Sequence, residues 1–317
     1  MPERTVQRPF PARPDQGGLS RTYALRRVVE AHMAWLAQRP DGVRADFSGA
    51  TLSDASLEGV NLSRALFRTT SLLEAVLIGA DLTGAVIENS DLRQASLSRA
   101  DLAGASLANS DCSLCLLEGA NLSEASLQHI SFRRSNLGAA RLLEARIQDC
   151  DFRGAVLRDA GLNHAEVFDT SFGDANLEGA VLYHARMQLC RFVGAAATDA
   201  NFGSARLQNC DFRGASLSGS KFFRADLSQS SLGRSVMAGC DLREAKLSGV
   251  DLNRTNLMSA QFDEAVLFAA DLRGANLRGA RGMSSLQLSQ ARTDSDTTLP
   301  NGSRGPYLRG SGAEKPG

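Results

Sequence analysis

A five-residue repeat dominates this chain from Ala45 onward. Written in fives, it reads ADFSG, ATLSD, ASLEG and continues without insertion to ANLRG at 275–279. The third residue of each repeat, position i, recurs from 47 to 277, which makes 47 repeats, and Leu or Phe fills 40 of these sites. Position i−2 is Ala at 30 sites, and otherwise small or apolar. Two residues in five therefore point inward, one large and one small.

A period of five fits neither a helix nor a strand, whose side chains repeat every 3.6 and 2.0 residues. A chain that turns a corner every five residues satisfies it, and four corners close a coil of 20 residues. Inward residues indeed correlate at spacing 20. One column of i−2 sites departs from Ala at ten of its twelve positions, and five successive i sites of the same wall are Phe132, Phe152, Phe172, Phe192 and Phe212. These rings are expected to stack as an aromatic ladder.

The repeats ADLTG (80–84), ANLSE (120–124) and ANLRG (275–279) carry an A-[DN]-L-x-x consensus that resembles the pentapeptide-repeat family. The resemblance covers 45–279, which is 235 of 317 residues. It implies an all-β fold, a right-handed quadrilateral β-helix with four repeats per coil. The 47 repeats would make about 12 coils and a rod roughly 55–60 Å long at the usual strand spacing. The interior is expected to be filled by side chains, without a ligand cavity.

The flanks of the repeats are expected to act as caps, because a solenoid exposes the edge and core of its last coil. Residues 22–37 have apolar residues at helical spacing and are followed by Pro40, so they predict a helix with Trp35 or Leu36 on the open core. Gly282 replaces an i residue and ends the repeat, after which Leu286 and Leu288 are expected to cap the last coil. The predicted organisation is a disordered segment 1–21, a capping helix and linker 22–44, the solenoid 45–279, a C-terminal cap 280–300 and a disordered tail 301–317.

All six cysteines fall on inward positions, Cys112 at i and the other five at i−2. They are predicted to be buried, reduced thiols rather than metal ligands or disulfides. Cys190 and Cys210 should stack on adjacent coils, where in-register side chains seldom have disulfide geometry, and a redox role for them is left open. No metal or cofactor site is predicted.

Two groups of outward residues are candidates for a partner-binding surface. His164 and His184 share position i+2 and differ by 20, with Tyr183 beside them and Phe223 and Arg224 two coils further along. They form either a partner-binding patch with weak capacity for metal capture, or an ordinary solvated wall. The second group is apolar at sites that are normally polar, and either packs under the terminal segments or forms a dimer or partner interface. Its members are Leu66, Leu73, Val76, Ile78 and Val86 in the early coils and Val266 and Phe268 near the end.

The sequence favours a non-enzymatic protein-binding or scaffolding module, because it has no nucleophile elbow, phosphate-binding loop or dinucleotide fingerprint. With 35 basic and 35 acidic residues, direct nucleic-acid binding is not expected. The absence of an apolar leader or an 18-residue apolar run indicates a cytoplasmic protein without a membrane span. The partner is expected to be a protein, and a homodimer through a solenoid end is a further interpretation.

The family resemblance suggests an alternative, a DNA mimic that binds DNA gyrase or topoisomerase IV and protects it from quinolones or toxins. Mimicry needs a strongly negative surface. Residues 45–279 hold 22 basic and 28 acidic residues, a net charge of −6. An outward column of Arg93, Arg133, Arg153, Arg213 and Arg273 further weakens this alternative. A secreted bacterial effector is the third interpretation.

Overall fold

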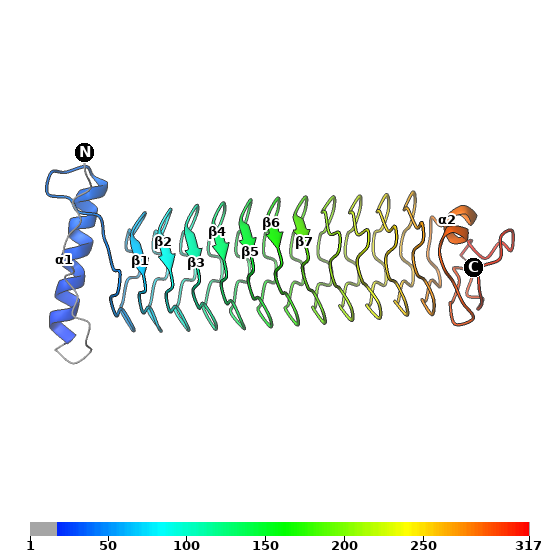
Figure 1. Ribbon diagram of the computed structural model, residues 1–317, viewed down its shortest axis with the longest axis horizontal. Coiled ribbons are helices and arrows are strands. Elements are labelled where there is room, and N and C mark those ends of the chain that lie inside the picture. The colour runs from blue at the N-terminus through cyan, green and yellow to red at the C-terminus, as the bar shows by residue number, and fades with distance from the viewer. Residues whose placement is uncertain (1–17, 317) are drawn as a thin grey trace. The chain divides into compact units, whose positions relative to one another are not determined.

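The computed structural model describes residues 18–316, and these divide into two compact units, the first ending at Arg146 and the second beginning at Ile147. The five-residue pattern continues through this boundary, so the sequence did not predict a division there. Both units are built from stacked coils of repeats, with one helix in each (Figure 1).

The first unit begins with helix α1, Gly18–Leu36. The sequence predicted a helix over 22–37 after a disordered segment 1–21. The helix begins four residues earlier than predicted, so residues 18–21 are helical. Residues 1–17 of the predicted disordered segment lie outside the described residues. Gly42 brings the following loop back onto the helix. A Cβ at this position would lie 2.3 Å from the Trp35 backbone nitrogen, so the close approach requires glycine.

His32 is the residue through which α1 docks onto the first repeats, and it is fully buried. Its Nδ1 accepts a hydrogen bond from the Ala45 N–H at 3.1 Å, and its Nε2 lies 3.1 Å from the Ser63 carbonyl oxygen. The first contact needs a bare nitrogen and the second a proton, so the imidazole is neutral with the proton on Nε2. The prediction that Trp35 or Leu36 covers the core was wrong, because the helix turns His32 and Ala34 inward and leaves those two half-buried.

The repeats of the first unit form a parallel β-solenoid with four walls. Bridges join residues 20 apart in four columns that are five residues apart, such as Asp46 to Leu66 and Thr51 to Ser71. One wall forms three-residue strands that pair in parallel and in register. These strands are β1 (Leu66–Arg68), β2 (Val86–Glu88), β3 (Ser106–Ala108) and β4 (Ser126–Gln128).

Within one repeat, the backbone both turns the corner and binds the next coil. The Leu52 N–H donates to the Ser71 carbonyl at 2.6 Å, and the Ser71 N–H donates back to Ala50 at 3.0 Å. The Ala55 N–H then bonds to the Leu52 carbonyl around a turn whose third residue, Asp54, has φ 59°. Left-handed residues at this position are what type II turns require, which explains the frequent Gly, Asn and Asp there.

Burial follows the predicted register. Every i residue from Phe47 to Leu277 is buried, and so is every i−2 residue except Ala55 and Val60 in the first coil. Strand β5 (Arg146–Gln148) begins at the last residue of the first unit, and β6 (Glu166–Phe168) and β7 (Arg186–Gln188) pair in parallel in the second. The three-residue strands thus recur over about six turns, from residue 66 to residue 186, fewer than the 12 or so coils predicted. The later repeats instead pair through single-residue bridges, such as Lys221 to Asp241.

The aromatic ladder is present in the second unit. The Phe152, Phe172, Phe192 and Phe212 rings stack with successive centroid separations of 5.0, 4.8 and 4.5 Å and interplanar angles of 7° or less. All four are buried. Their in-register stacking confirms the 20-residue coil that the sequence predicted.

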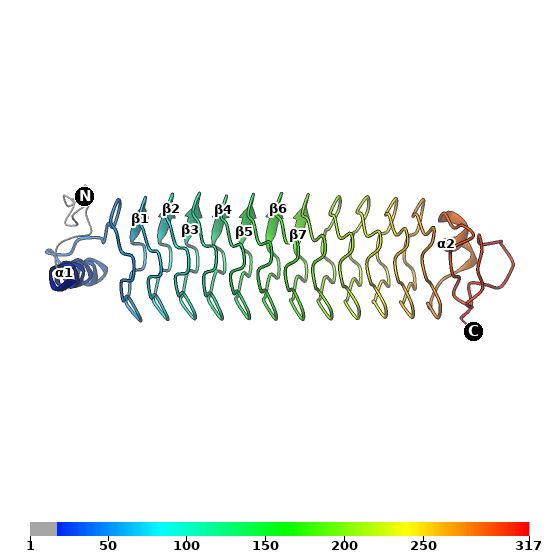
Figure 2. The same ribbon diagram turned by 90° about the horizontal axis from the view of Figure 1, so that it is seen from below.

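The C-terminal end of the second unit is closed by helix α2, Ser285–Gln290, and the segment after it (Figures 1 and 2). Leu288 is buried as predicted, whereas Leu286 is 59% exposed, because the Gln287 amide rather than Leu286 contacts the last coil, donating to the Phe262 and Ala265 carbonyls. Arg292 and Thr298 then bridge to Asp271 and Asn276, continuing the ladder after the repeat has ended.

The predicted disorder of 301–317 was wrong for the described part of that segment. The Tyr307 hydroxyl donates to the Glu314 carboxylate at 3.0 Å and lies 2.6 Å from the Ser285 hydroxyl, and the Tyr307 N–H donates to Thr293. These long-range bonds hold a stretch with few apolar residues. Because α1 and this C-terminal segment cover the terminal coils of their units, a homodimer through a solenoid end would have to displace them.

Ser235 provides a direct test of the inward i−2 register. It is buried, and its hydroxyl has no hydrogen-bond partner in the part of the chain that the structure describes. Leaving a buried polar group unpaired costs about 1–3 kcal/mol. Ser235→Ala is therefore expected to raise the free energy of unfolding by about 1 kcal/mol in urea denaturation. Ser220→Ala is the matched control, since Ser220 Oγ donates to the Ala197 carbonyl at 2.6 Å, and it should not stabilise. Equal effects of the two changes would contradict this account.

Candidate functional site

Five of the predicted surface residues gather on one wall of the second unit, here called the aromatic wall: His164, Tyr183, His184, Phe223 and Arg224. The His164 and His184 rings stack at 5.2 Å with an interplanar angle of 15°. The Tyr183 ring meets His184 edge-on at 4.2 Å. The predicted stacking of the two histidines on adjacent coils is therefore present.

The other half of the aromatic wall is built around Phe223. The Arg224 guanidinium lies over this ring at 4.7 Å and the Arg243 guanidinium at 5.7 Å. Arg224 also pairs with Glu244 at 2.7 Å, and the hydrogen bond to this carboxylate, together with its charge, raises the pKa of Arg224. The wall thus combines aromatic faces with oriented cations, which attract one another through the ring quadrupole.

Gly203 lies between the two halves of the aromatic wall, in the same column as Tyr183 and Phe223. A Cβ on Gly203 would lie 3.1 Å from the Tyr183 ring. The missing side chain therefore leaves room for the Tyr183 ring next to Gly203. This leaves Gly203 buried and Tyr183 42% exposed.

Turn geometry directs these side chains outward. His164, His184 and Arg224 have φ of 56°, 59° and 57°, the left-handed corner of their repeats. The preceding i residues, Leu162 and Leu182 for the histidines, are buried in the core. Each wall residue therefore follows a buried i residue by one or two positions, which fixes its place on the surface without a loop.

The chemistry of this wall is that of a contact surface. Its groups are exposed or half-buried rather than enclosed. Over residues 18–316, no three His, Cys, Asp or Glu side chains gather in a way that would hold a metal ion. Aromatic rings and arginine are the residue types enriched at energetically important positions of protein interfaces.

The apolar candidates of the first unit do not form an exposed patch. Leu66, Val76, Ile78 and Val86, like Leu73, are half-buried. Leu66 and Val86 are register partners in β1 and β2, so their side chains cover each other along the wall. Near the other terminus, Phe268 is 62% exposed and Val266 44% exposed, so the C-terminal segment does not cover them.

The cysteines occupy the predicted inward positions, and all six are buried. Burial raises the pKa of Cys240 to about 12. Hydrogen bonding with Cys210, together with burial, raises the pKa of Cys190. A thiol with a raised pKa is a poor nucleophile at neutral pH, so these residues act as packing groups.

Aspartate at i−1 and arginine at i+1 of the same repeat form recurring ion pairs on the walls. Hydrogen bonds from Arg93 and Arg273 lower the pKa of Asp91 and Asp271 respectively. The same pairing joins Asp151 to Arg153, Asp211 to Arg213 and Asp241 to Arg243, at 2.6–2.7 Å. These five pairs neutralise part of the acidic surface within the chain.

One site escaped the sequence-based prediction. Between Arg213 and Arg273, the arginine column is interrupted at Gly233 and Asn253, and a groove opens over the wall. The available signal was the change from Asp-x-Arg in DFR and DLR to Asp-x-Asn in DLN at 251–253. Gly233 and Asn253 are ordinary residues for a repeat, so the absence of arginine at these two positions is harder to recognise than an unusual side chain would be.

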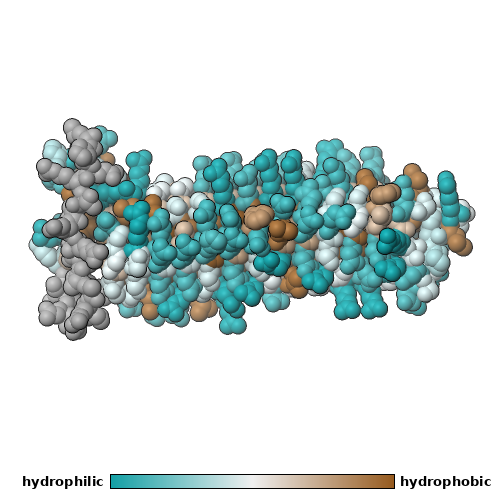
Figure 3. Space-filling model, in the orientation of Figure 1, coloured by the Kyte–Doolittle hydropathy of each residue, from teal (hydrophilic) through white to brown (hydrophobic). Residues whose placement is uncertain are grey.

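The remaining surface is predominantly hydrophilic on the face shown in Figure 3, with apolar residues in small separated groups. Such scattered groups are ordinary for a protein surface. Neither helix among the described residues has the length and apolar character needed to cross a membrane.

Comparison with solved structures finds several pentapeptide-repeat proteins. HetL from the cyanobacterium Nostoc sp. strain PCC 7120, a protein involved in heterocyst differentiation regulation, is 27% identical over 74% of this chain and 92% of its own, with a TM-score of 0.38. A trypsin-treated form of QnrB1, a plasmid-mediated fluoroquinolone resistance protein, is 24% identical over 58% of this chain and 89% of its own, with a TM-score of 0.37. A pentapeptide-repeat protein from the Arabidopsis thaliana thylakoid lumen is 25% identical over 36% of this chain and 79% of its own, with a TM-score of 0.27.

No match is found among curated protein sequences. Family models do match. The model for pentapeptide repeats (8 copies) matches residues 43–69, 61–99, 95–134, 120–159, 135–174 and 259–291. The model for a pentapeptide repeat region matches residues 165–242. With well over half of its length matched by these models, the chain belongs to the pentapeptide-repeat family.

Proposed function

We propose that this protein is a non-enzymatic binding module that holds a protein partner on the aromatic wall of its second unit. The observation that carries the proposal is that one wall presents two such groups, His164, His184 and Tyr183 with ring contacts of 4.2–5.2 Å, and Phe223 with Arg224 over it at 4.7 Å. Residues fixed by backbone turns lose little freedom when a partner binds, which favours affinity. The absence of an enclosed polar site at this wall supports binding rather than catalysis.

The partner is best sought by comparing two variants of the full chain. The wall variant carries Tyr183→Ser, Phe223→Ser and Arg224→Ser. The matched control carries Phe168→Ser, Leu189→Ser and Arg191→Ser, which remove one exposed ring, one exposed apolar group and one arginine elsewhere in the same unit. Wild-type protein and control are expected to capture the same partner from a native lysate of the source cells, and the wall variant to lose it.

Isothermal titration with the purified partner then measures the loss. Truncating central aromatic and arginine residues of an interface commonly costs 2 kcal/mol or more, so the wall variant is expected to raise the Kd by about 30-fold or more. The control should change it by less than about threefold. A partner that binds the wall variant as tightly as the wild type, or that is lost equally from both variants, would refute the proposal.

The alternative function is DNA mimicry towards DNA gyrase or topoisomerase IV. Mimicry depends on an extended negative field, whereas the repeats carry a net charge of only −6. Several of the arginines in this count lie directly against carboxylates, as at Asp211 and Asp241, so the negative charge is also interrupted locally. The same wild-type protein is expected to leave gyrase supercoiling unchanged at micromolar concentration, with and without a quinolone. A clear effect there would replace the proposed function with the alternative.

A further inference from the structure

A groove of about 660 Å³ lies on the wall of the second unit that covers the aromatic ladder. Arg213, Gly233, Asp251, Asn253 and Arg273 contribute to its lining, together with Arg234. This wall lies two repeats around the coil from the aromatic wall, because its i residues are 212, 232, 252 and 272. Its volume falls within the range of protein ligand sites.

The repeats that flank the groove show how this wall pairs its charges. Arg213 donates from Nε and Nη2 to both carboxylate oxygens of Asp211, at 2.6–3.1 Å. Arg273 does the same with Asp271. In both repeats the planar guanidinium comes from two residues after the aspartate and matches the carboxylate as a fork.

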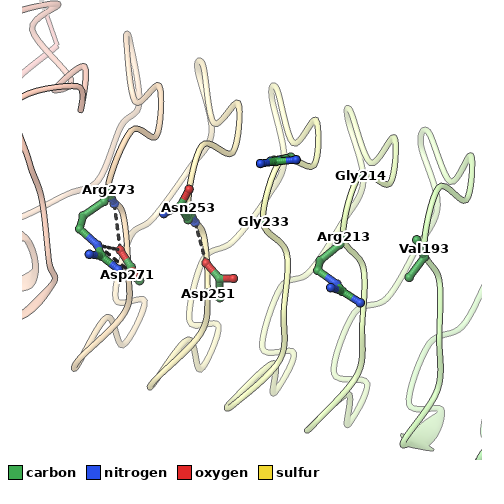
Figure 4. Close-up of a pocket in the computed structure, with 9 residues that line it drawn as sticks. Val193, Arg213, Gly214, Gly233, Asp251, Asn253, Asp271 and Arg273 are labelled. Atoms are coloured by element: carbon green, nitrogen blue, oxygen red, sulfur yellow. Dashed lines mark hydrogen bonds and ion pairs between the residues drawn. The ribbon is translucent and has the colours of Figure 1, made fainter.

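Asp251 occupies the same position in its repeat, but Asn253 stands where the arginine would be. The Asn253 backbone N–H donates to Oδ1 at 2.9 Å, and Oδ2 has only the Ser231 hydroxyl at 3.5 Å. Figure 4 shows the contrast between Arg273, which lies against Asp271, and Asp251, which is joined to the backbone of Asn253 and to no arginine among the residues drawn. The arginines on either side are paired with their own aspartates, and Asp251 adds only a minor contribution to the raised pKa of Arg213.

Gly233, one coil before Asn253, opens space beside this carboxylate. A Cβ on Gly233 would lie 3.3 Å from Asp251 Oδ2, so that oxygen faces the notch left by the missing side chain. A carboxylate oxygen with one long hydrogen bond and adjacent free space favours a cationic group from outside the chain.

We propose that this notch receives an arginine side chain of a protein partner, whose guanidinium pairs with Asp251 as Arg213 pairs with Asp211. Arginine suits the position better than lysine, because its planar fork binds both carboxylate edges and tolerates stacking beside Arg213 and Arg273. The partner thereby supplies in trans the arginine that the repeat at 251–253 lacks.

Arg234 defines a second feature of the partner. It lines the same groove, and no carboxylate among residues 18–316 pairs with it. An acidic side chain next to the incoming arginine would satisfy Arg234 and offset its repulsion of the guanidinium. The groove therefore fits a polypeptide segment in which an arginine and an acidic residue lie close together.

This inference concerns a different wall from the proposed aromatic contact and is tested without a cellular partner, so either can fail alone. The probe is N-acetyl-arginine amide, titrated into the ¹⁵N-labelled full chain, with N-acetyl-citrulline amide as its uncharged analogue. Saturable amide shifts are expected at Gly233, Asp251 and Asn253 with the arginine probe alone. Asp251→Asn should weaken binding by about fivefold or more, as expected when a charge-assisted pair is removed at a partly exposed site.

A pair of glycine variants tests the notch separately from the charge. Gly233→Leu fills it and should abolish the shifts. Gly173→Leu places the same side chain in the same column three coils earlier, where a Cβ meets neighbours at 3.5 Å or more, and should preserve them. If Gly233→Leu disturbs folding, Asp251→Asn still decides. Equal binding of the citrulline probe, unchanged affinity in Asp251→Asn, or equal shifts at exposed aspartates such as Asp54 would overturn the proposal.

Discussion

Replacing Phe192 by alanine is expected to destabilise the second unit by about 3–5 kcal/mol. Phe192 is fully buried and stacks between Phe172 at 4.8 Å and Phe212 at 4.5 Å, with Phe202 edge-on at 6.3 Å. Alanine removes the buried ring and both stacked contacts. The coil cannot collapse to fill the space, because backbone ladders fix it to both neighbours.

Urea denaturation monitored by circular dichroism measures this loss, and hydrogen exchange locates it. In a solenoid each coil contacts only its neighbours, so lost amide protection should centre on the coils of Phe172, Phe192 and Phe212. Val193→Ala is the matched control, since Val193 follows Phe192 directly and its side chain is 41% exposed. A loss below about 1.5 kcal/mol for Phe192→Ala, or one no larger than that of the control, would contradict the ladder as a source of stability.

Helix α1 is expected to detach from the first repeats when His32 is replaced by alanine. The change leaves the Ala45 N–H and the Ser63 carbonyl without their partner. Each buried group left unpaired costs about 1–3 kcal/mol. The only tryptophan of the chain, Trp35, stacks on His32 at 5.5 Å, so its fluorescence reports the docking directly.

Acid should have the same effect on the wild type. Burial, the largest cause, lowers the pKa of His32 below its usual 6.5. Below about pH 6.5 the unfolded chain therefore binds a proton that the docked helix does not, so the docking free energy is complete above this pH and declines as the pH falls towards the lowered folded pKa. A proton on Nδ1 would also face the Ala45 N–H.

Thermal unfolding followed by Trp35 fluorescence between pH 5 and 8 tests this dependence. The wild type and the control His129→Ala, an exposed histidine of the same unit, should lose stability in parallel as the pH falls below about 6.5. The His32→Ala variant should have a lower unfolding midpoint at every pH, and this midpoint should change less between pH 6.5 and 5. A wild-type midpoint that does not change between pH 8 and 5 would rule out His32 as the sensitive group.

The sequence predicted the solenoid well because its rule is local and repeated. A large residue at i and a small one at i−2 define the inside of every repeat, so an atypical repeat does not change the register that its neighbours predict. The caps have no such repetition. The apolar spacing of α1 did not show that His32, rather than Trp35, faces the core, because the choice depends on two backbone groups far along the chain. Tyr307 escaped prediction for the same reason, since its partners lie 7 and 22 residues away.

The surface was predictable where it depends on columns. Spacing by 20 placed His164 beside His184 before any coordinates. It could not show that Leu66 and Val86 shield each other to half-burial, which depends on how side chains lean along the wall. The groove at Asp251 required noticing what two positions lack, an arginine at 253 and any side chain at 233. A sequence gives the identity of each side chain, but the free space beside Asp251 depends on which residues lie next to one another on adjacent coils.

The bridges that join residues 20 apart also set the length changes that the second unit tolerates. Deleting one whole coil, such as 203–222, would return every later residue to its own wall and bring Phe223 directly beside Tyr183. Deleting a single repeat would keep the inward residues inside, yet carry every later side chain around one corner, so that Arg224 would no longer follow His184. Both deletions keep the inward residues inside, but only the deletion of a whole coil keeps the same outward side chains together on one wall. Where a surface is under selection, insertions and deletions are therefore expected to be multiples of 20 residues. Multiples of five residues are expected only where the surface is not under selection.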